Sequence, residues 1–218
     1  MGSATEFGRL AMFPLQSAFL PGEDLPLQIF EPRYAEMVRD CMRDNSPRFG
    51  VVLISQGREV GGGDMRSDVG TVARITECVE VGDSGRFILR CRTAERIKVC
   101  EWLPDDPYPR AVVEEWPDEP GESVSAGQLE DLEDRMMALF ERIANARDFP
   151  VPDRQEVLGS GLDFSDAGER LYALASRIPI GPADRYSVLT APTAHARLTA
   201  LGEAVDSVAA IIEFQLSQ

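Results

Sequence analysis

The chain has 218 residues, with 37 acidic against 22 basic side chains and a formal net charge of -15. Its hydrophobic content of 44% is typical of a globular protein, so intrinsic disorder is excluded, and the length suits one large domain or two small ones. We find no apolar run near the ~20 residues of a membrane helix and no secretory signal, and we expect a cytoplasmic protein.

The inventory of reactive residue types excludes several classes of enzyme. Lys98 is the only lysine and His195 the only histidine, so a site that needs two histidines cannot form within one chain. The glycine run at residues 61–63 is followed by Asp64, where a phosphate-binding loop of a nucleotide hydrolase has lysine. Lys98 is expected on the solvent side of a strand, and His195 in the polar first turn of a helix. We therefore expect no catalytic residues, no metal site and no cofactor.

The four cysteines, Cys41, Cys78, Cys91 and Cys100, form no C-x-x-C pair. Zinc-ligand spacing is therefore absent, and a disulfide framework is not expected in a chain of this size without a secretion signal. Each cysteine falls in an apolar stretch. We expect all four to be free thiols that pack as small core residues.

Short apolar runs separated by glycine and proline predict seven strands in the first half of the chain. The strands are Met12–Leu15, Asp24–Ile29, Phe49–Ser55, Thr71–Val81, Arg86–Arg92, Arg96–Leu103 and Arg110–Trp116. The stretch Gly82–Gly85 indicates a hairpin turn, and the strand spacing suits a small barrel or sandwich. One amphipathic helix, from Glu31 to Arg43, is expected between the second and third strands, with Pro32 in its first turn.

After a connector rich in proline and acidic residues, the apolar residues recur at steps of three and four. This period predicts a helix over 125–147, a second helix with Ser165 as N-cap, a short helix opened by Pro182 and a long last helix capped by Thr193. We therefore predict an α+β protein in which a β subdomain with one helix precedes an α-helical bundle that ends in a long helix.

The same change of period divides the chain into four segments. They are an N-terminal tail (1–9), a β subdomain (10–116), a linker (117–124) and a helical bundle (125–218).

Arg90, Arg92, Arg96 and Lys98 alternate along two predicted strands, and four cations on one face could follow a phosphate backbone. Nearby glutamates can pair with them across the sheet, and the net charge of -15 repels polyanions. These glutamates are Glu77, Glu80, Glu95 and Glu101. We favour cross-strand ion pairs, and RNA binding stays open as an alternative.

Three N-terminal stretches have the order strand, turn, strand, helix. They are Met12-Phe13-Pro14-Leu15, Phe19-Leu20-Pro21-Gly22 and Leu25-Pro26-Leu27-Gln28-Ile29-Phe30-Glu31-Pro32-Arg33-Tyr34. The series resembles the start of the Lon substrate-binding domain, the N-terminal domain of Lon-type ATP-dependent proteases. The resemblance continues through Phe49–Ile54, Val69–Ile75 and Pro182–Arg185, and it covers roughly residues 10–216.

The resemblance implies a PUA-like β-barrel followed by a helical bundle, and a role in engaging unfolded or tagged polypeptides. Neither the ATPase module nor the serine–lysine protease module is found in these residues. We therefore expect a stand-alone, non-catalytic peptide-binding protein, acting as an adaptor to a protease or chaperone. The alternatives are an RNA-binding PUA-like module and an uncharacterised hydrolase that uses carboxylates or Cys91 and Cys100. The oligomeric state stays open.

If the binding site follows the family, it lies near the corner where the second strand meets the first helix. Helix initiation and core packing also explain most of this motif, and Arg33 is the residue that packing explains least. Aromatic residues around the turn at 104–107 suit either packing or binding. The predicted peptide-binding residues are Phe30, Glu31, Arg33, Tyr34, Trp102 and Tyr108.

Overall fold

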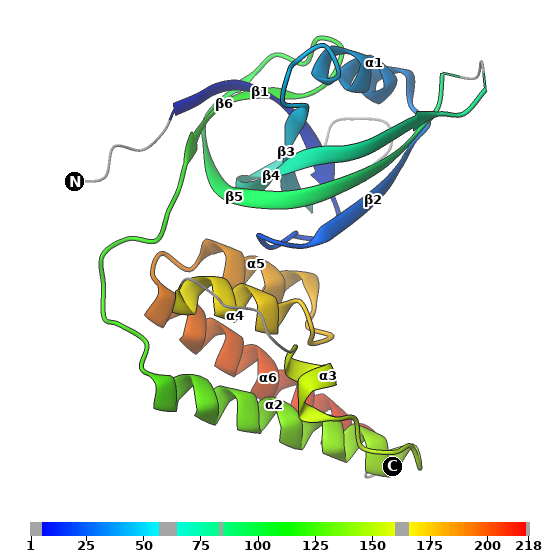
Figure 1. The fold of residues 1–218 in the computed structure, drawn as a ribbon. Coiled ribbons are helices and arrows are strands. Elements are labelled where there is room, and N and C mark those ends of the chain that lie inside the picture. Colours follow the sequence, from blue (N-terminus) through cyan, green and yellow to red (C-terminus); the bar gives the residue numbers. More distant parts are fainter. Residues whose placement is uncertain (1–5, 57–64, 83–84, 160–165, 217–218) are drawn as a thin grey trace. The chain divides into compact units, whose positions relative to one another are not determined.

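In the part of the chain that the structure describes, six strands form one sheet in the first half (Figure 1). The computed structural model describes residues 6–56, 65–82, 85–159 and 166–216. The glycine run at 61–63, the turn residues 83–84 and the predicted cap at 165 lie outside the described residues. The strands are β1 (Glu6–Leu15), β2 (Asp24–Ile29), β3 (Arg48–Gln56), β4 (Met65–Glu80), β5 (Phe87–Leu103) and β6 (Arg110–Glu115).

The strand order is β2-β5-β4-β3-β1-β6, and β5 also pairs with β6. The pairing of β6 with β5 therefore closes a circuit of five strands, β5, β4, β3, β1 and β6. β2 lies outside this circuit and pairs with β5. β1 and β3 are parallel, whereas the other neighbouring pairs are antiparallel. β1 begins at Glu6, inside the segment expected as a tail, because its first residues pair with β6.

The prediction of separate strands at Arg86–Arg92 and Arg96–Leu103 is wrong, because β5 runs unbroken through both. The polar residues between them suggested a break. Instead, Thr93 is buried, and its hydroxyl donates to the carbonyl of Leu20 at 2.6 Å. β4 supplies partners on both sides of this point, so the ladder continues.

Helix α1 (Pro32–Cys41) begins with proline in its first turn and buries residues spaced three and four apart. These buried residues are Tyr34, Ala35, Met37, Val38 and Cys41. They join one hydrophobic cluster with side chains of β1, β2, β3 and β5, and a second cluster within the sheet includes Met12, Val72, Ile97 and Val113. The two clusters hold the strands and α1 together.

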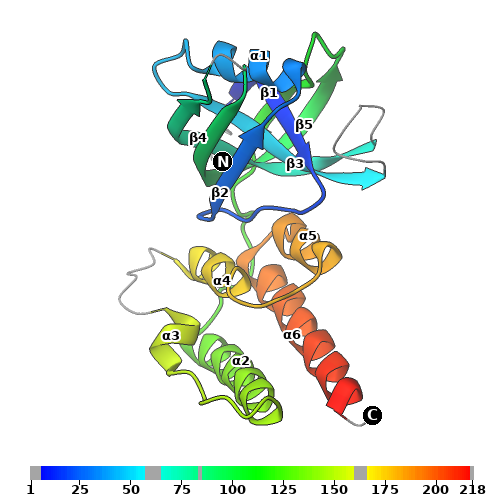
Figure 2. The same cartoon turned by 90° about the vertical axis from the view of Figure 1, so that its right-hand side faces the viewer.

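Five helices lie in the described residues of the second half (Figures 1 and 2). They are α2 (Ala126–Ala146), α3 (Arg154–Leu158), α4 (Ala167–Ala175), α5 (Pro182–Thr190) and α6 (Ala194–Leu216). α6 contacts α2, α4 and α5, so it forms the centre of this group. The contacts divide the chain into two compact units, Met1–Pro117 and Asp118–Gln218. Among the described residues, none of the helices combines the length and the apolar character needed to cross a membrane.

Local capping signals explain where these helices begin. Ser125 and Gln128 form a capping box at α2, and the hydroxyl of Thr193 accepts the N–H of Ala196 at 3.0 Å at the start of α6. The N-cap of α4 is Asp166, one residue after the predicted Ser165, because the Asp166 carboxylate accepts the N–H of Glu169. The short helix α3 was not predicted, since it spans only one turn or so.

The cysteine prediction holds for Cys41 and Cys91, which are free and buried in the first cluster. Cys78 is half-buried. The prediction is wrong for Cys100, which is exposed because it alternates with buried Val99 along β5. Burial raises the pKa of the Cys41 and Cys91 thiols to about 12.

Candidate functional site

Exposed apolar side chains meet on the outer face of three neighbouring strands, near the turn between β4 and β5. Ile88 of β5 is in register with Gln28 of β2 on one side and with Val79 of β4 on the other. The side chains of Val79 and Ile88 are 57% and 48% exposed. Residues in register on adjacent strands lie about 5 Å apart and share a face. Val79 and Ile88 therefore form one continuous apolar surface.

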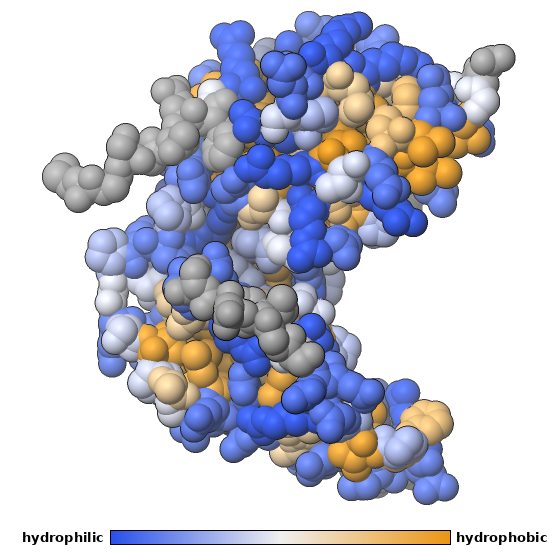
Figure 3. All heavy atoms as spheres, in the orientation of Figure 1, coloured by the Kyte–Doolittle hydropathy of each residue, from blue (hydrophilic) through white to orange (hydrophobic). Residues whose placement is uncertain are grey.

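Phe30 and Val81 lie two residues beyond Gln28 and Val79, just past the ends of β2 and β4, and the N–H of Val81 donates to the carbonyl of exposed Arg86 beside them. Phe30 and Val81 are 59% and 44% exposed. We call Phe30, Val79, Val81 and Ile88 the apolar face, and Figure 3 shows hydrophobic residues gathered on this part of the first unit. Isolated exposed apolar residues are ordinary, but contiguous ones mark interaction surfaces.

Ion pairs lie next to the apolar face, further along β2, β5 and β4 from the turn. Arg90, the next outward residue of β5, lies 3.4 Å from the Glu77 carboxylate of β4, and Arg92 lies 2.7 Å from that of Asp24. Arg39 of α1 lies 3.9 Å from Glu80, but this pair is on the opposite, α1-facing side of β4, beside buried Phe87. Charged residues next to an apolar centre are typical of protein-binding surfaces.

The four predicted cations do not form one exposed stripe. Arg96 is buried, and its guanidinium donates to the carbonyls of Trp116 and Pro117 at 2.8 and 3.3 Å. The reason is a bulge: Thr93 and Arg96 of β5 oppose Ala73 and Thr71 of β4, so one extra residue in β5 reverses the alternation. Arg90 pairs with Glu77, as expected from the sequence, whereas Arg92 pairs with Asp24 of β2, which was not among the expected partners.

At the predicted corner, Phe30 faces outward and the next residues turn into α1. Arg33 donates from Nε to the Glu31 carboxylate at 3.0 Å, and its guanidinium lies 4.5 Å from the centre of the Tyr34 ring. Tyr34 is only 4% exposed and packs against Phe13 with ring centroids 4.4 Å apart. Tyr34 is therefore a core residue, whereas Glu31 and Arg33 form a partly buried ion pair above it.

Tyr108 is buried in the same cluster as Tyr34. Its hydroxyl donates to the Asp40 carboxylate of α1 at 2.8 Å. Burial, together with this hydrogen bond, raises the pKa of Tyr108 to about 12. The bond fastens α1 to the segment before β6, which is a structural role.

Trp102 lies near the end of β5 in a polar network. Its indole N–H donates to Asp68 at 3.1 Å, and the Arg66 guanidinium lies 5.2 Å from its ring centre. Arg66 also donates two hydrogen bonds to Asp105, at 2.9 and 2.8 Å. These bonds lower the pKa of Asp105 against the effect of partial burial, and the charges of Arg66 and Arg33 add to the lowering. Arg66 thus joins Trp102 to Asp105 in one polar network.

The structure therefore sorts the predicted residues into three groups. Tyr34 and Tyr108 belong to the core, Glu31, Arg33 and Trp102 belong to polar networks, and Phe30 belongs to the apolar face. The other members of that face were not predicted. A signal for Ile88 was present in the sequence. In a strand through the apolar run Phe87-Ile88-Leu89, the side chain of Ile88 must point to the opposite face from those of Phe87 and Leu89.

Within the ranges that the structure describes, no group of three or more histidine, cysteine, aspartate or glutamate side chains is arranged to hold a metal ion. His195 lies at the start of α6, with Nε2 3.9 Å from the Glu122 carboxylate.

The solved structures that are similar to this chain include two Lon N-terminal domains. A Lon N-terminal domain protein from Xanthomonas campestris has a TM-score of 0.62 and 27% sequence identity, and the match covers 88% of this chain and 96% of that one. The N-terminal domain of Mycobacterium avium complex Lon protease has a TM-score of 0.61 over 91% of this chain and 98% of its own, and at 14% identity it supports the fold alone.

Two curated relatives match 108 residues at 32% identity, which is 48% of this chain. They are the Lon protease of Anaeromyxobacter dehalogenans (strain 2CP-C) and Lon protease 2 of Myxococcus xanthus. The match spans only 12% and 13% of their lengths. The family model of the ATP-dependent protease La (LON) substrate-binding domain matches residues 9–207. Since that match covers most of the chain, the protein belongs to the Lon substrate-binding domain family.

Proposed function

We propose that this domain binds exposed apolar segments of polypeptides on the apolar face and performs no chemistry on them. The observation that carries the proposal is the exposure of Val79 and Ile88 in register on β4 and β5, with exposed Phe30 and Val81 just past the ends of β2 and β4. Membership of a substrate-binding domain family supports a polypeptide ligand, and the matched module is distinct from the protease and ATPase modules of Lon.

The ligand packs against the face of the sheet rather than adding a strand to its edge. Among the described strands, β2 pairs only with β5, so its outer edge is a possible site for strand addition. Pro26 is at the centre of β2 and lacks an N–H, so it removes a donor from any added ladder. Side-chain burial on the apolar face therefore provides the main binding energy.

Glu31 and Arg33 follow Phe30 directly and provide polar contacts beside the apolar face. Trp102 extends this polar border, while Tyr34 and Tyr108 act only by fixing the position of α1. The wider role that fits this arrangement is that of an adaptor, presenting unfolded or tagged polypeptides to a protease or chaperone. In this proposal the closed strand circuit is the PUA-like barrel of the family, and it serves as a rigid platform.

A peptide titration tests the site. The probe is a fluorescein-labelled, uncharged peptide of alternating leucine and serine, and the measurement is fluorescence anisotropy with the full chain. Replacing Phe30 by Gln and Ile88 by Thr removes two half-exposed apolar side chains, each worth about 1 kcal/mol when a ligand covers it. The double variant is expected to weaken binding about thirtyfold, which corresponds to ~2 kcal/mol.

The matched control replaces Met42 and Met65 by Gln, because these side chains are also exposed apolar residues of the first unit but lie outside the apolar face. This control should bind as the parent chain does. Equal affinities of the parent and the Phe30–Ile88 variant, with unchanged circular dichroism, would show that the peptide binds elsewhere or not at all.

A further inference from the structure

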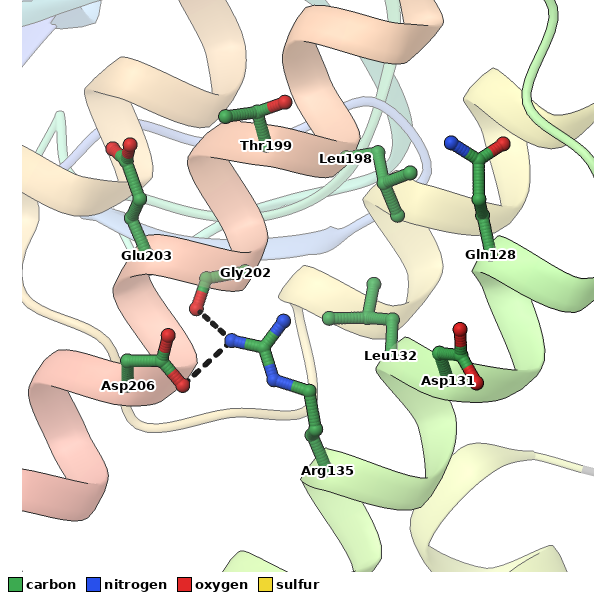
Figure 4. A pocket seen from close by; sticks show the side chains of 9 residues that line it. All are labelled: Gln128, Asp131, Leu132, Arg135, Leu198, Thr199, Gly202, Glu203 and Asp206. Carbon is green, nitrogen blue, oxygen red and sulfur yellow. Dashed lines mark hydrogen bonds and ion pairs between the residues drawn. The ribbon is translucent and has the colours of Figure 1, made fainter.

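The second unit contains an open groove between α2 and α6, with a volume of about 340 Å³ (Figure 4). Leu132 of α2 and Leu198 of α6 project into it from opposite helices and provide an apolar floor. Leu132 is buried and Leu198 is half-buried. Leu198 is thus the leucine that a ligand in the groove can reach, while Leu132 closes the base of the groove between the two packed helices.

Carboxylates surround this floor. Asp131 of α2 is on one rim, and Glu203 and Asp206 of α6 are on the other (Figure 4). One cation, Arg135, is present, and it is already engaged: its guanidinium lies 2.6 Å from the Asp206 carboxylate and donates to the carbonyl of Gly202 at 2.8 Å. Within the described part of the chain, the carboxylates of Asp131 and Glu203 have neither a hydrogen bond nor an ion pair.

We infer that this groove binds a basic segment of a partner polypeptide, in which leucine-like side chains accompany arginine or lysine. The apolar atoms of the segment cover Leu198, and its cationic groups reach Asp131 and Glu203 on the rims. Arginine and lysine suit such a site because their aliphatic stems pack on apolar surface while their charged ends stay at the rim.

Charge supports a cationic occupant over the alternatives. The second unit carries 18 acidic and 8 basic side chains, so its field attracts cations and repels acidic segments and nucleic acids. A second copy of the chain is disfavoured for the same reason, because its second unit has the same excess of negative charge. This surface is separate from the apolar face, and the inference does not depend on the proposed function.

The test uses a fluorescein-labelled peptide of leucine–arginine pairs separated by serine, titrated with the full chain by fluorescence anisotropy. The variant Asp131→Asn with Glu203→Gln removes two of the three rim charges and leaves Asp206 paired with Arg135, while keeping side-chain size. Two exposed ion pairs contribute up to about 1 kcal/mol each, so we expect about tenfold weaker binding. The variant Leu198→Gln should weaken binding as well, because it makes the floor polar.

The matched control is Glu130→Gln with Glu141→Gln. Both residues are exposed carboxylates of α2 outside the groove, and this variant removes the same number of negative charges. The control should bind like the parent chain. If both charge variants weaken binding equally, or neither does, the groove is not the site. Equal binding of a peptide with citrulline in place of arginine would also overturn the inference, since citrulline has the same shape without the charge.

The two binding proposals can fail separately. The Phe30–Ile88 variant leaves the groove intact, and the Asp131–Glu203 variant leaves the apolar face intact. The uncharged peptide reports on the first surface and the arginine peptide on the second, so each combination of variant and peptide identifies which surface binds.

Discussion

Replacing Asp118 by Ala should destabilise the helical unit by about 3 kcal/mol. The Arg197 side chain is only 1% exposed, and its guanidinium forms a two-point ion pair with Asp118, of which one contact is 2.9 Å. It also lies 3.8 Å from the centre of the Tyr172 ring. Removing one partner of a buried pair costs about 3–5 kcal/mol, and we take the low end because Asp118 is 34% exposed.

Two signals distinguish the units in a urea titration. Both tryptophans, Trp102 and Trp116, lie in the first unit, whereas α2 to α6 lie in the second. Far-ultraviolet circular dichroism therefore follows mainly the helical unit, and tryptophan fluorescence follows the first unit. We expect the dichroism transition of the Asp118 variant to move to lower urea. A decrease of less than about 1 kcal/mol in the free energy of unfolding would refute the reasoning, because an unpaired buried guanidinium destabilises a protein by more than that.

Two further variants sharpen this test. Arg197→Met combined with Asp118→Ala should be more stable than Asp118→Ala alone, because the uncompensated charge is gone. Gly168→Ala should be destabilising although alanine favours helices, since a Cβ at this position would lie 2.7 Å from Asp118 Oδ2 and 2.8 Å from Arg197 Nη1. A stabilising Gly168→Ala variant would mean that the ion pair has room to move.

Two more predictions follow from the perturbed pKa values. At pH 8 the exposed Cys100 should react fast with a thiol reagent. The buried thiols of Cys41 and Cys91, whose pKa values are raised to about 12, should react only as fast as the protein unfolds. Equal reaction rates for all thiols would contradict the assigned burial. Tyr108 has its pKa raised from 10 to about 12, so folding favours the neutral phenol, and its contribution to stability is complete below pH 10 and declines toward pH 12. Urea midpoints measured across this range should fall less steeply for Tyr108→Phe than for the parent chain, and identical slopes would count against the assignment.

Much of the candidate site lay beyond sequence reasoning, because exposure depends on which strand face is covered. Phe30 was predicted on the strength of a motif, yet its neighbour Tyr34, from the same motif, is a core residue. Ile88 was missed because it lies within the apolar run Phe87-Ile88-Leu89, and Val79 because it lies among both charged and apolar residues, a pattern that does not show which face is covered. Only the register between β2, β5 and β4 places them side by side on an outward face.

The residue inventory and the hydrophobic period determined the division into a strand-rich half and a helical half, and they determined most helix starts, because capping and periodicity act within a few residues. Tertiary structure alone decided the continuity of β5, the burial of Arg96 at a bulge and the pairing of Arg197 with Asp118. These features join residues that are far apart in the chain, and their energies depend on desolvation and on strand register, which local sequence does not specify.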